Sequence, residues 1–393
     1  MIHRRFGRTE LAMPVITCGG MRYQQSWKDE DAGAIAKENQ ENLERTIHYA
    51  VENGINHIET ARGYGSSEMQ LGRILPSFPR DKIIVQTKVA PAETEKEFLD
   101  KFEKSMAYLQ LDHVDLLGIH GINTPELLDL TLRKGGALET ARKLQKDGRV
   151  RFVGFSTHAE VDTIVNAINT DEFDYVNLHW YYVNQVNWPA IVAATQRDMG
   201  VFIISPNDKG GKLYAPSEKL GRLCEPFSPM AFNDLFCLSR PEVHTLSMGV
   251  ARPSDFDEHL LALKSLDKAE EVLPPIIQRL DAEIEKVIGP LWPLEWSVGI
   301  PDSTIMPGNI NVREIVRLWV MAKAFDLETF AKERYNLFGE GGHWFPGLQA
   351  IEVDAAKLHP LIHSSPLRER IPNILREAHQ WFAAEQKKRL SQG

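Results

Sequence analysis

Short apolar runs alternate along the chain with longer stretches in which apolar residues recur every three or four positions. The short runs are continuous rather than alternating, which is typical of parallel strands that are covered on both faces. Eight such runs occur within the first 250 residues, at 13–20, 56–61, 82–89, 114–121, 151–157, 175–182, 201–206 and 243–249. The pattern therefore predicts eight buried parallel strands.

Helix-period segments separate these strands. Examples lie at 42–54, 95–110, 136–148 and 160–170, and several of them end in glycine, which suits the left-handed position after a helix. Eight strand and helix pairs over roughly 250 residues predict an α/β protein with a (β/α)₈ TIM barrel. The alternative is a doubly wound sheet. That architecture calls for a G-x-G-x-x-G turn after the first strand, and TCGGMRYQQSW at 17–27 does not supply one.

The pattern changes beyond about residue 265. Residues 270–289 and 311–338 have helical periodicity, and loops rich in Trp, Pro and Gly separate them. We expect a barrel over residues 1–265 and a mostly helical C-terminal region over 266–393. Residues 379–390, HQWFAAEQKKRL, predict a terminal amphipathic helix whose basic end suits the helix dipole.

Composition excludes several classes of protein. A length of 393 residues exceeds the roughly 250–300 that one hydrophobic core supports, so we expect more than one structural unit. The net charge of −9 disfavours a nucleic-acid-binding protein. No run approaches the roughly 20 apolar residues of a membrane span, and the N-terminal sequence lacks a signal-peptide core, so we expect a cytoplasmic protein. Cys18, Cys224 and Cys237 form no CxxC pair, so neither a disulfide framework nor a metal site is predicted.

Polar residues stand at the ends of four consecutive predicted strands. Glu59, Lys88 and His120 end the second, third and fourth strands, and Tyr64 follows Glu59 closely. The fifth strand ends with the polar residues 156–158. Active residues of a (β/α)₈ barrel collect at this rim. Lys88 can stabilise a Tyr64 phenolate, Glu59 can hold Lys88, and His120 can orient a substrate oxygen. The combination suits proton delivery to a carbonyl oxygen.

Each of these residues also has an ordinary structural interpretation. Tyr64 alone would be a half-buried surface aromatic, Lys88 a snorkelling side chain, His120 a core histidine and Glu59 a helix cap. Their coincidence on one rim favours the functional interpretation, because a lysine buried there without a partner would be costly.

Five motifs occur in order between residues 2 and 262: RRFGRTELAMPVITCGGMRY, GINHIETARGYGSSEMQLGRIL, VDLLGIHGIN, GRVRFVGFST and SMGVARPSDFDEHL. Together these motifs resemble those of the aldo-keto reductase superfamily. The second resembles the family motif GIN-x-x-DTA-x-x-YG-x-SE-x-x-LG. The resemblance implies that Glu59, Tyr64, Lys88 and His120 form the catalytic tetrad, with Tyr64 as general acid.

The resemblance also implies a nicotinamide cofactor bound without a Rossmann fold. Ser156 matches a position near the nicotinamide carboxamide, and Asn177 stands where the family usually has Gln. Lys212 lies in the loop that covers the pyrophosphate. Arg252 falls where the 2′-phosphate is usually held, which favours NADPH over NADH. Ser205 and Asp255 complete the expected cofactor site.

The chain departs from the family at several positions. Glu59 replaces aspartate, Thr157 replaces an Asn, and Ile204 stands where many members have a stacking Tyr. Parts of the sequence resemble the prokaryotic branch that carries a ferredoxin-like extension with four-cysteine clusters, yet no cysteine follows Cys237. We expect instead that loops bearing aromatic residues fill that space or cover the barrel mouth. These residues are Trp292, Trp296, Trp344 and Phe345.

Two functions follow from this sequence. The first is NADPH-dependent reduction of an aldehyde or ketone, with a small-molecule carbonyl compound as substrate and a homo-oligomer as a possible state. The second is an NADPH-binding sensor or scaffold protein with weak or no catalysis, in which the C-terminal region contacts a partner.

Overall fold

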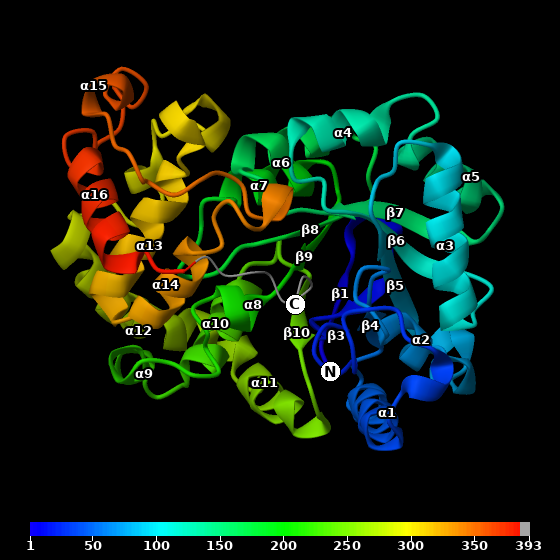
Figure 1. Cartoon of the computed structure of the whole chain (residues 1–393). Coiled ribbons are helices and arrows are strands. Elements are labelled where there is room, and N and C mark those ends of the chain that lie inside the picture. The colour runs from blue at the N-terminus through cyan, green and yellow to red at the C-terminus, as the bar shows by residue number, and fades with distance from the viewer. Residues whose placement is uncertain (386–393) are drawn as a thin grey trace.

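The computed structural model describes residues 1–385 and contains a closed barrel of eight parallel strands (Figure 1). The strands are hydrogen-bonded in the order β10-β3-β4-β5-β6-β7-β8-β9. Each falls within or beside one of the eight apolar runs, so the predicted (β/α)₈ barrel is confirmed. The strands are β3 (Ile16–Gly19), β4 (His57–Glu59), β5 (Ile84–Val89), β6 (Val114–His120), β7 (Val150–Ser156), β8 (Tyr175–Leu178), β9 (Gly200–Ile203) and β10 (Thr245–Gly249).

Helices surround the barrel and bury their apolar stripes against it. α3 begins where the Thr94 side chain accepts a hydrogen bond from the backbone N–H of Glu97. The expected glycine stops are present at Gly54 and Gly148, which have φ angles of 78° and 75°. The barrel helices are α1 (Lys37–Glu52), α2 (Ser67–Leu71), α3 (Glu95–Leu109), α4 (Pro125–Leu132), α5 (Ala137–Lys146), α6 (Val161–Asn169), α7 (Trp188–Gln196), α8 (Pro206–Lys209), α9 (Glu218–Cys224), α10 (Pro229–Leu238) and α11 (Asp257–Leu263).

An antiparallel hairpin precedes the barrel. Its strands, β1 (His3–Arg5) and β2 (Ala12–Pro14), pair from His3 with Pro14 to Arg5 with Ala12. Phe6 in its turn packs in a small apolar cluster with Tyr175 and Phe202 from two barrel strands. The hairpin therefore packs against interior residues of the barrel at the end opposite the expected catalytic rim.

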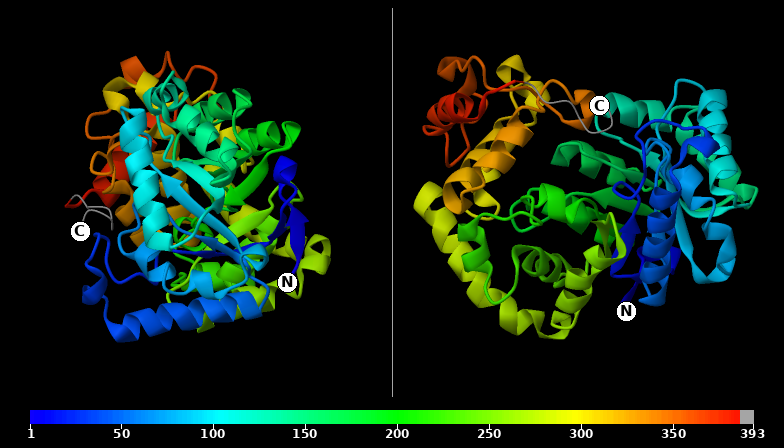
Figure 2. Two further views of the ribbon diagram at one scale, coloured as in Figure 1. Left: turned by 90° about the vertical axis from the view of Figure 1, so that its right-hand side faces the viewer. Right: turned by 60° about the horizontal axis from the view of Figure 1, so that its bottom comes forward.

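The C-terminal region is helical, as expected, and lies against one side of the barrel. Figures 1 and 2 show its helices beside α8, α9 and α10, and one continuous hydrophobic core joins the two parts. The division at residue 265 stays a proposal. The terminal helix α16 ends at Phe382, and the basic residues predicted to extend it lie outside the described residues. These helices are α12 (Ala269–Ile288), α13 (Val312–Phe325), α14 (Glu328–Tyr335), α15 (Ala355–Leu358) and α16 (Ile371–Phe382).

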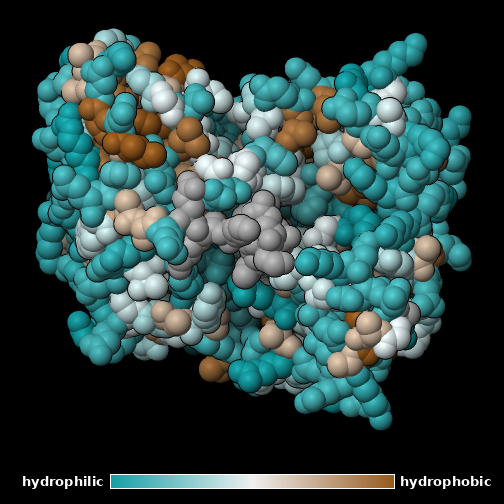
Figure 3. All heavy atoms as spheres, in the orientation of Figure 1, coloured by the Kyte–Doolittle hydropathy of each residue, from teal (hydrophilic) through white to brown (hydrophobic). Residues whose placement is uncertain are grey.

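The visible surface is mostly hydrophilic. Figure 3 shows one larger apolar area, which lies over the C-terminal helices. Within residues 1–385, no helix combines the length and apolar character needed to cross a membrane. Over the same residues, no three His, Cys, Asp or Glu side chains gather in a way that could hold a metal ion. The large apolar side chains exposed in the C-terminal region are Val298, Ile305, Leu348 and Ile351.

Candidate active site

The carboxyl ends of β4, β5 and β6 bring the predicted tetrad to one rim. Glu59 pairs with Gln86 in the β4 and β5 ladder, and Lys88 pairs with Gly118 in the β5 and β6 ladder. His120 is the last residue of β6. Successive parallel strands thus place the carboxylate, the ammonium and the imidazole side by side, as the sequence predicts.

Lys88 and Glu59 form a buried ion pair. Lys88 Nζ donates to the Glu59 carboxylate and to the backbone oxygen of Thr60, the latter at 2.7 Å. Lys88 is 1% exposed and Glu59 3%. Burial lowers the pKa of Lys88 well below its ordinary value, and the facing carboxylate opposes this effect by favouring the charged form. Glu59 therefore holds both the charge and the position of Lys88.

The extra methylene of Glu59 has a structural explanation. Its second carboxylate oxygen, Oε2, accepts a hydrogen bond of 3.2 Å from the Ser247 hydroxyl on β10. Gly19 on β3 leaves room for this contact, because a Cβ there would lie 2.6 Å from Ser247 Oγ and 3.3 Å from Oε2. The glutamate thus bridges Lys88 on one side and Ser247 on the other.

Tyr64 lies over the ion pair. Its ring centroid is 4.8 Å from Lys88 Nζ, which is within the range of a cation–π contact. The rings of Tyr64 and His120 meet edge to face, with centroids 5.8 Å apart and an interplanar angle of 82°. All four residues predicted to be catalytic therefore gather at one point of the rim.

A charged network fixes the loop that carries Tyr64. Arg62 forms ion pairs with buried Glu68 on α2 and with Asp29. Glu68 also accepts a 2.5 Å hydrogen bond from the Thr87 hydroxyl on β5. Sequence reasoning did not single out these residues, although Glu68 stands in the SE of the second quoted motif. Their contacts restrict the loop and so restrict the position of Tyr64.

Ser156 and Asn177 are paired residues of β7 and β8. Both are buried, and the Ser156 hydroxyl accepts a 3.1 Å hydrogen bond from the backbone N–H of Gly121. Neither amide atom of Asn177 has a hydrogen-bond partner among the described residues. The Tyr175 ring lies inside the barrel, close to Gly154 and Gly118. Side chains two residues apart on a strand point to the same face, so the Asn177 side chain also points into the barrel. A buried donor and acceptor thus remain available beside the tetrad.

Lys212 and Ser205 lie in the segment that follows β9. Ser205 begins α8 with a φ of 52° and is half-buried. Lys212 Nζ pairs with the Glu333 carboxylate of α14 at 2.5 Å. The C-terminal region therefore supplies an acidic partner for the lysine that we expect at the cofactor pyrophosphate. Contact of Lys212 and Ser205 with a cofactor stays a prediction.

Arg252 and Asp255 form a pair in the turn after β10. The Asp255 carboxylate accepts from the backbone N–H groups of Ala251 and Arg252, at 2.8 and 3.3 Å, and from Arg252 Nε at 3.1 Å. The Arg252 side chain is 72% exposed. Asp255 thus positions the Arg252 guanidinium through its Nε atom, and the side chain is exposed enough to bind a phosphate ligand.

Trp344, from the C-terminal region, lies against the catalytic rim. Its ring is 4.9 Å from that of His120 and 5.5 Å from that of His158, centroid to centroid. Gly121 permits this approach, because a Cβ there would lie 2.4 Å from the indole. Phe345 packs on Phe338. Of the two roles expected for the aromatic loops, the Trp344 contact favours covering of the mouth.

A pocket lies on the far side of Trp344, between the barrel and α13 and α14. Its volume is about 740 Å³ including its open mouth. It contains charged groups that the sequence did not identify as a site. Of these groups, only His158 was placed at a strand end by the sequence; His179 falls inside the predicted strand 175–182, and only the structure, in which β8 ends at Leu178, places it just after a strand. The polar lining residues include His158, Glu160, His179, Lys209, Arg313, Glu314, Arg317 and Arg334.

Residues 15–206 match the model of the aldo/keto reductase family. Over these residues the chain is similar to the aldo-keto reductase superfamily. It is 24% identical over 290 residues to L-galactose dehydrogenase of Arabidopsis thaliana, which covers 65% of this chain and 86% of that protein. It is 32% identical over 149 residues to glyoxal reductase of Bacillus subtilis, covering 35% of this chain and 51% of that protein.

A solved structure has the same fold. The aldo-keto reductase from Klebsiella pneumoniae in complex with NADPH matches with a TM-score of 0.54 at 18% identity, covering 70% of this chain and 96% of that one. The chain spans about half the length of several curated relatives. The relatives' names are those of reductases and dehydrogenases, in agreement with the expected enzyme class.

Proposed function

We propose that this chain is an NADPH-dependent oxidoreductase that reduces an aldehyde or ketone to the alcohol. The observation that carries the proposal is the gathering of Tyr64, Lys88, Glu59 and His120 at the carboxyl end of the barrel. The match of residues 15–206 to the aldo/keto reductase family and a structural neighbour crystallised with NADPH support it.

The residues around the tetrad fit a nicotinamide cofactor. A primary carboxamide offers one donor group and one acceptor. The buried Asn177 amide, which has no hydrogen-bond partner within residues 1–385, offers the complementary pair. The exposed guanidinium of Arg252 suits a terminal phosphate and so favours NADPH. When bound, NADPH supplies the hydride.

The tetrad handles the proton. Tyr64 Oη donates a proton to the substrate oxygen as negative charge develops there. Lys88, 4.8 Å from the ring centroid, stabilises the resulting phenolate electrostatically, and Glu59 keeps Lys88 in place. His120 orients the same oxygen by a hydrogen bond. Trp344 covers this part of the mouth and helps to exclude water.

The test is oxidation of NADPH at 340 nm with a panel of aldehydes and ketones. Tyr64→Phe should lower kcat by roughly 10²–10⁴-fold, because the proton donor is lost. Calorimetric affinity for NADPH should not change. Tyr49→Phe is the matched control, since that phenol bonds Asp257 away from the mouth. Full turnover by Tyr64→Phe would contradict the mechanism. The sensor alternative predicts instead that NADPH binds and no carbonyl compound is consumed.

A further inference from the structure

A histidine and an aspartate outside the tetrad form a buried pair. His259 Nδ1 on α11 lies 2.5 Å from Asp234 Oδ2 on α10. The exposed fractions of the two residues are 2% and 0%. Burial raises the pKa of Asp234, and the facing imidazole opposes this rise by favouring the carboxylate. Burying such a pair costs desolvation energy, and the tetrad chemistry does not use it.

Asp234 determines which nitrogen of His259 donates to it. A carboxylate only accepts hydrogen bonds, so Nδ1 is the donor in this pair. Nε2, on the other side of the ring, lies 3.2 Å from Nδ2 of Asn207 on α8. Burial alone would lower the pKa of the imidazole, but Asp234 raises it above its ordinary value, with smaller contributions from Glu258 and Asp255.

The Asn207 amide can bond either form of His259. Its NH₂ group donates to Nε2 of the neutral ring. After a half-turn of the amide, its oxygen accepts from the Nε2–H of the charged ring. In the present orientation this oxygen, Oδ1, has no hydrogen-bond partner among the described residues. The link between α8 and α11 therefore persists in both forms.

Asn207 belongs to the segment that carries Lys212. The Asn207 backbone oxygen accepts from the Leu213 N–H at 2.8 Å, and the Asp208 oxygen accepts from the Lys212 N–H at 2.9 Å. Lys212 has a φ of 55°, in the left-handed region that strains a residue with a Cβ. Such a conformation persists only where the surrounding structure holds it. The side-chain anchor of Asn207 therefore restricts the position of Lys212.

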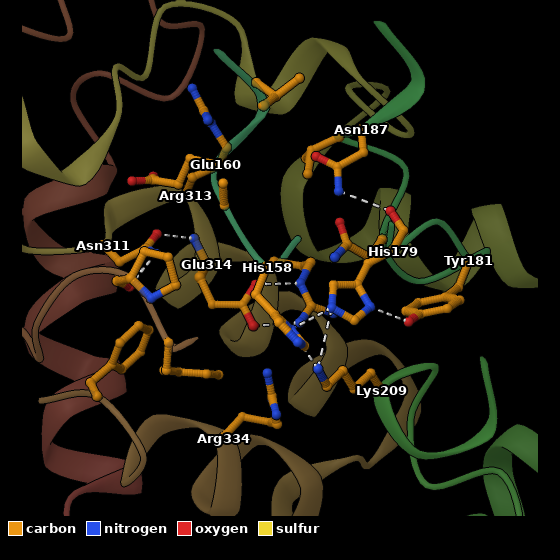
Figure 4. A pocket seen from close by; sticks show the side chains of 18 of the residues that line it. His158, Glu160, His179, Tyr181, Asn187, Lys209, Asn311, Arg313, Glu314 and Arg334 are labelled. Carbon is orange, nitrogen blue, oxygen red and sulfur yellow. Dashed lines mark hydrogen bonds and ion pairs between the residues drawn. The ribbon is translucent and has the colours of Figure 1, made fainter. Parts of the chain in front are cut away.

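Two side chains fasten α8 to different parts of the fold. Lys209 Nζ lies 3.2 Å from His179 Nε2 in the pocket between the barrel and α13 and α14 (Figure 4). Asn207 reaches His259 on α11, the helix directly after the turn that carries Arg252. His259 thus connects the segment expected at the cofactor pyrophosphate with the turn expected at the 2′-phosphate.

We propose that His259, braced by Asp234, is a positioning residue for the cofactor, because through Asn207 it fixes the loop that places Lys212 at the pyrophosphate. The proposal rests on the NADPH-dependent function above and adds residues that act without touching the cofactor. Loss of the link should weaken NADPH and NADH alike, since both contain the pyrophosphate. The tetrad should keep its geometry, because its strands, β4 to β6, carry none of these three residues.

Calorimetry with NADPH and NADH tests the link from both sides. Asn207→Leu removes the amide at similar volume. The pair variant, Asp234→Leu with His259→Phe, removes the other partner, and it should fold, because apolar replacement of a buried charged pair is often neutral or stabilising. Each variant should weaken both dinucleotides by roughly 3- to 10-fold, the effect of one hydrogen bond. The triple variant should lose no more than either alone, because the three residues form one link.

Asn56→Leu is the matched control. The Asn56 amide also donates one hydrogen bond, to the Lys82 oxygen at 3.1 Å, and its Oδ1 is also buried without a partner among the described residues. Asn56 directly precedes β4, so it lies at the end of the barrel opposite the tetrad. Asn56→Leu should leave both affinities unchanged. Melting temperatures of the two Leu variants show whether a weaker affinity in Asn207→Leu merely follows a loss of stability.

Turnover separates this inference from the reductase proposal. In carbonyl reduction, Asn207→Leu should raise the KM for NADPH and leave kcat at saturating NADPH unchanged, because the proton donor is intact. If no carbonyl compound is reduced but both affinities still depend on Asn207 and His259, the positioning role stands and the reductase proposal fails.

Three results would overturn the positioning role. The first is an NADPH affinity that is unchanged in Asn207→Leu and in the pair variant, or absent in the parent protein. The second is a triple variant whose loss is the product of the separate losses, which would mean independent effects. The third is a loss for NADPH with NADH unaffected, which would assign the effect to the turn with Arg252 rather than to the loop with Lys212.

Discussion

Replacing Glu59 with glutamine tests the buried ion pair that supports Tyr64. The substitution preserves the shape of the side chain and removes the carboxylate that faces Lys88. Both residues are almost completely buried, at 3% and 1% exposure. The folded variant must either keep an unpaired ammonium in the barrel or release its proton.

Release of the Lys88 proton sets an upper limit on the decrease in the free energy of unfolding. Releasing a proton from a lysine of ordinary pKa, about 10.4, costs about 4.6 kcal/mol at pH 7 and about 1.9 kcal/mol at pH 9. Breaking a buried pair by removing one partner typically costs about 3–5 kcal/mol, so the loss at pH 7 should approach this limit. The direction of the pH dependence of stability follows from the lowered pKa of Lys88. The unfolded state binds more protons than the folded state, so the stability of the variant rises with pH.

Urea unfolding at pH 7 and pH 9, followed by circular dichroism, measures this difference. Glu59→Gln should lose about 3–4.6 kcal/mol at pH 7 and no more than about 2 kcal/mol at pH 9. The double variant with Lys88→Met should recover most of the loss, because neither charge remains. Glu10→Gln, in the exposed pair with Arg5, should show a much smaller effect. A loss for Glu59→Gln as small as in that control, or equal at both pH values, would refute the reasoning.

Two other substitutions test nearby contacts. Gly19→Ala should destabilise the fold by about 1–3 kcal/mol, because its Cβ would lie 2.8 Å from a backbone carbonyl oxygen. Thermal unfolding checks this against Gly221→Ala, where the Cβ meets nothing within 4 Å. Glu333→Gln releases Lys212 and should tighten NADPH binding by up to about fivefold, since the pair is worth about 0.2–1 kcal/mol. Calorimetry measures the NADPH affinity of this variant and of the control Glu328→Gln, which breaks an ion pair with Lys332 on the same helix. Equal NADPH affinities of the two variants would argue against a contact of Lys212 with the pyrophosphate.

The sequence determined the barrel and the positions of the tetrad. Continuous apolar runs specify strands that are buried on both faces, and eight of them separated by helix-period segments leave few alternatives to a closed barrel. Because neighbouring parallel strands end at one rim, Glu59, Lys88 and His120 were predictable as neighbours from their places at strand ends. The helical character of residues 270–289 and 311–338 was also predictable, because their apolar residues recur with helical periodicity.

Only the tertiary structure decided what the C-terminal region does. Three features join residues that are more than 100 positions apart in the sequence. They are the ion pair of Lys212 with Glu333, the ring contact of His120 with Trp344, and the presence of Lys209 and Arg334 in the lining of one pocket. No periodicity encodes such contacts, because they depend on how whole helices pack against the barrel. Local patterns of hydrophobic and polar residues thus specified the elements and the rim chemistry, whereas long-range packing placed Trp344 at the catalytic rim and the C-terminal helices against the barrel.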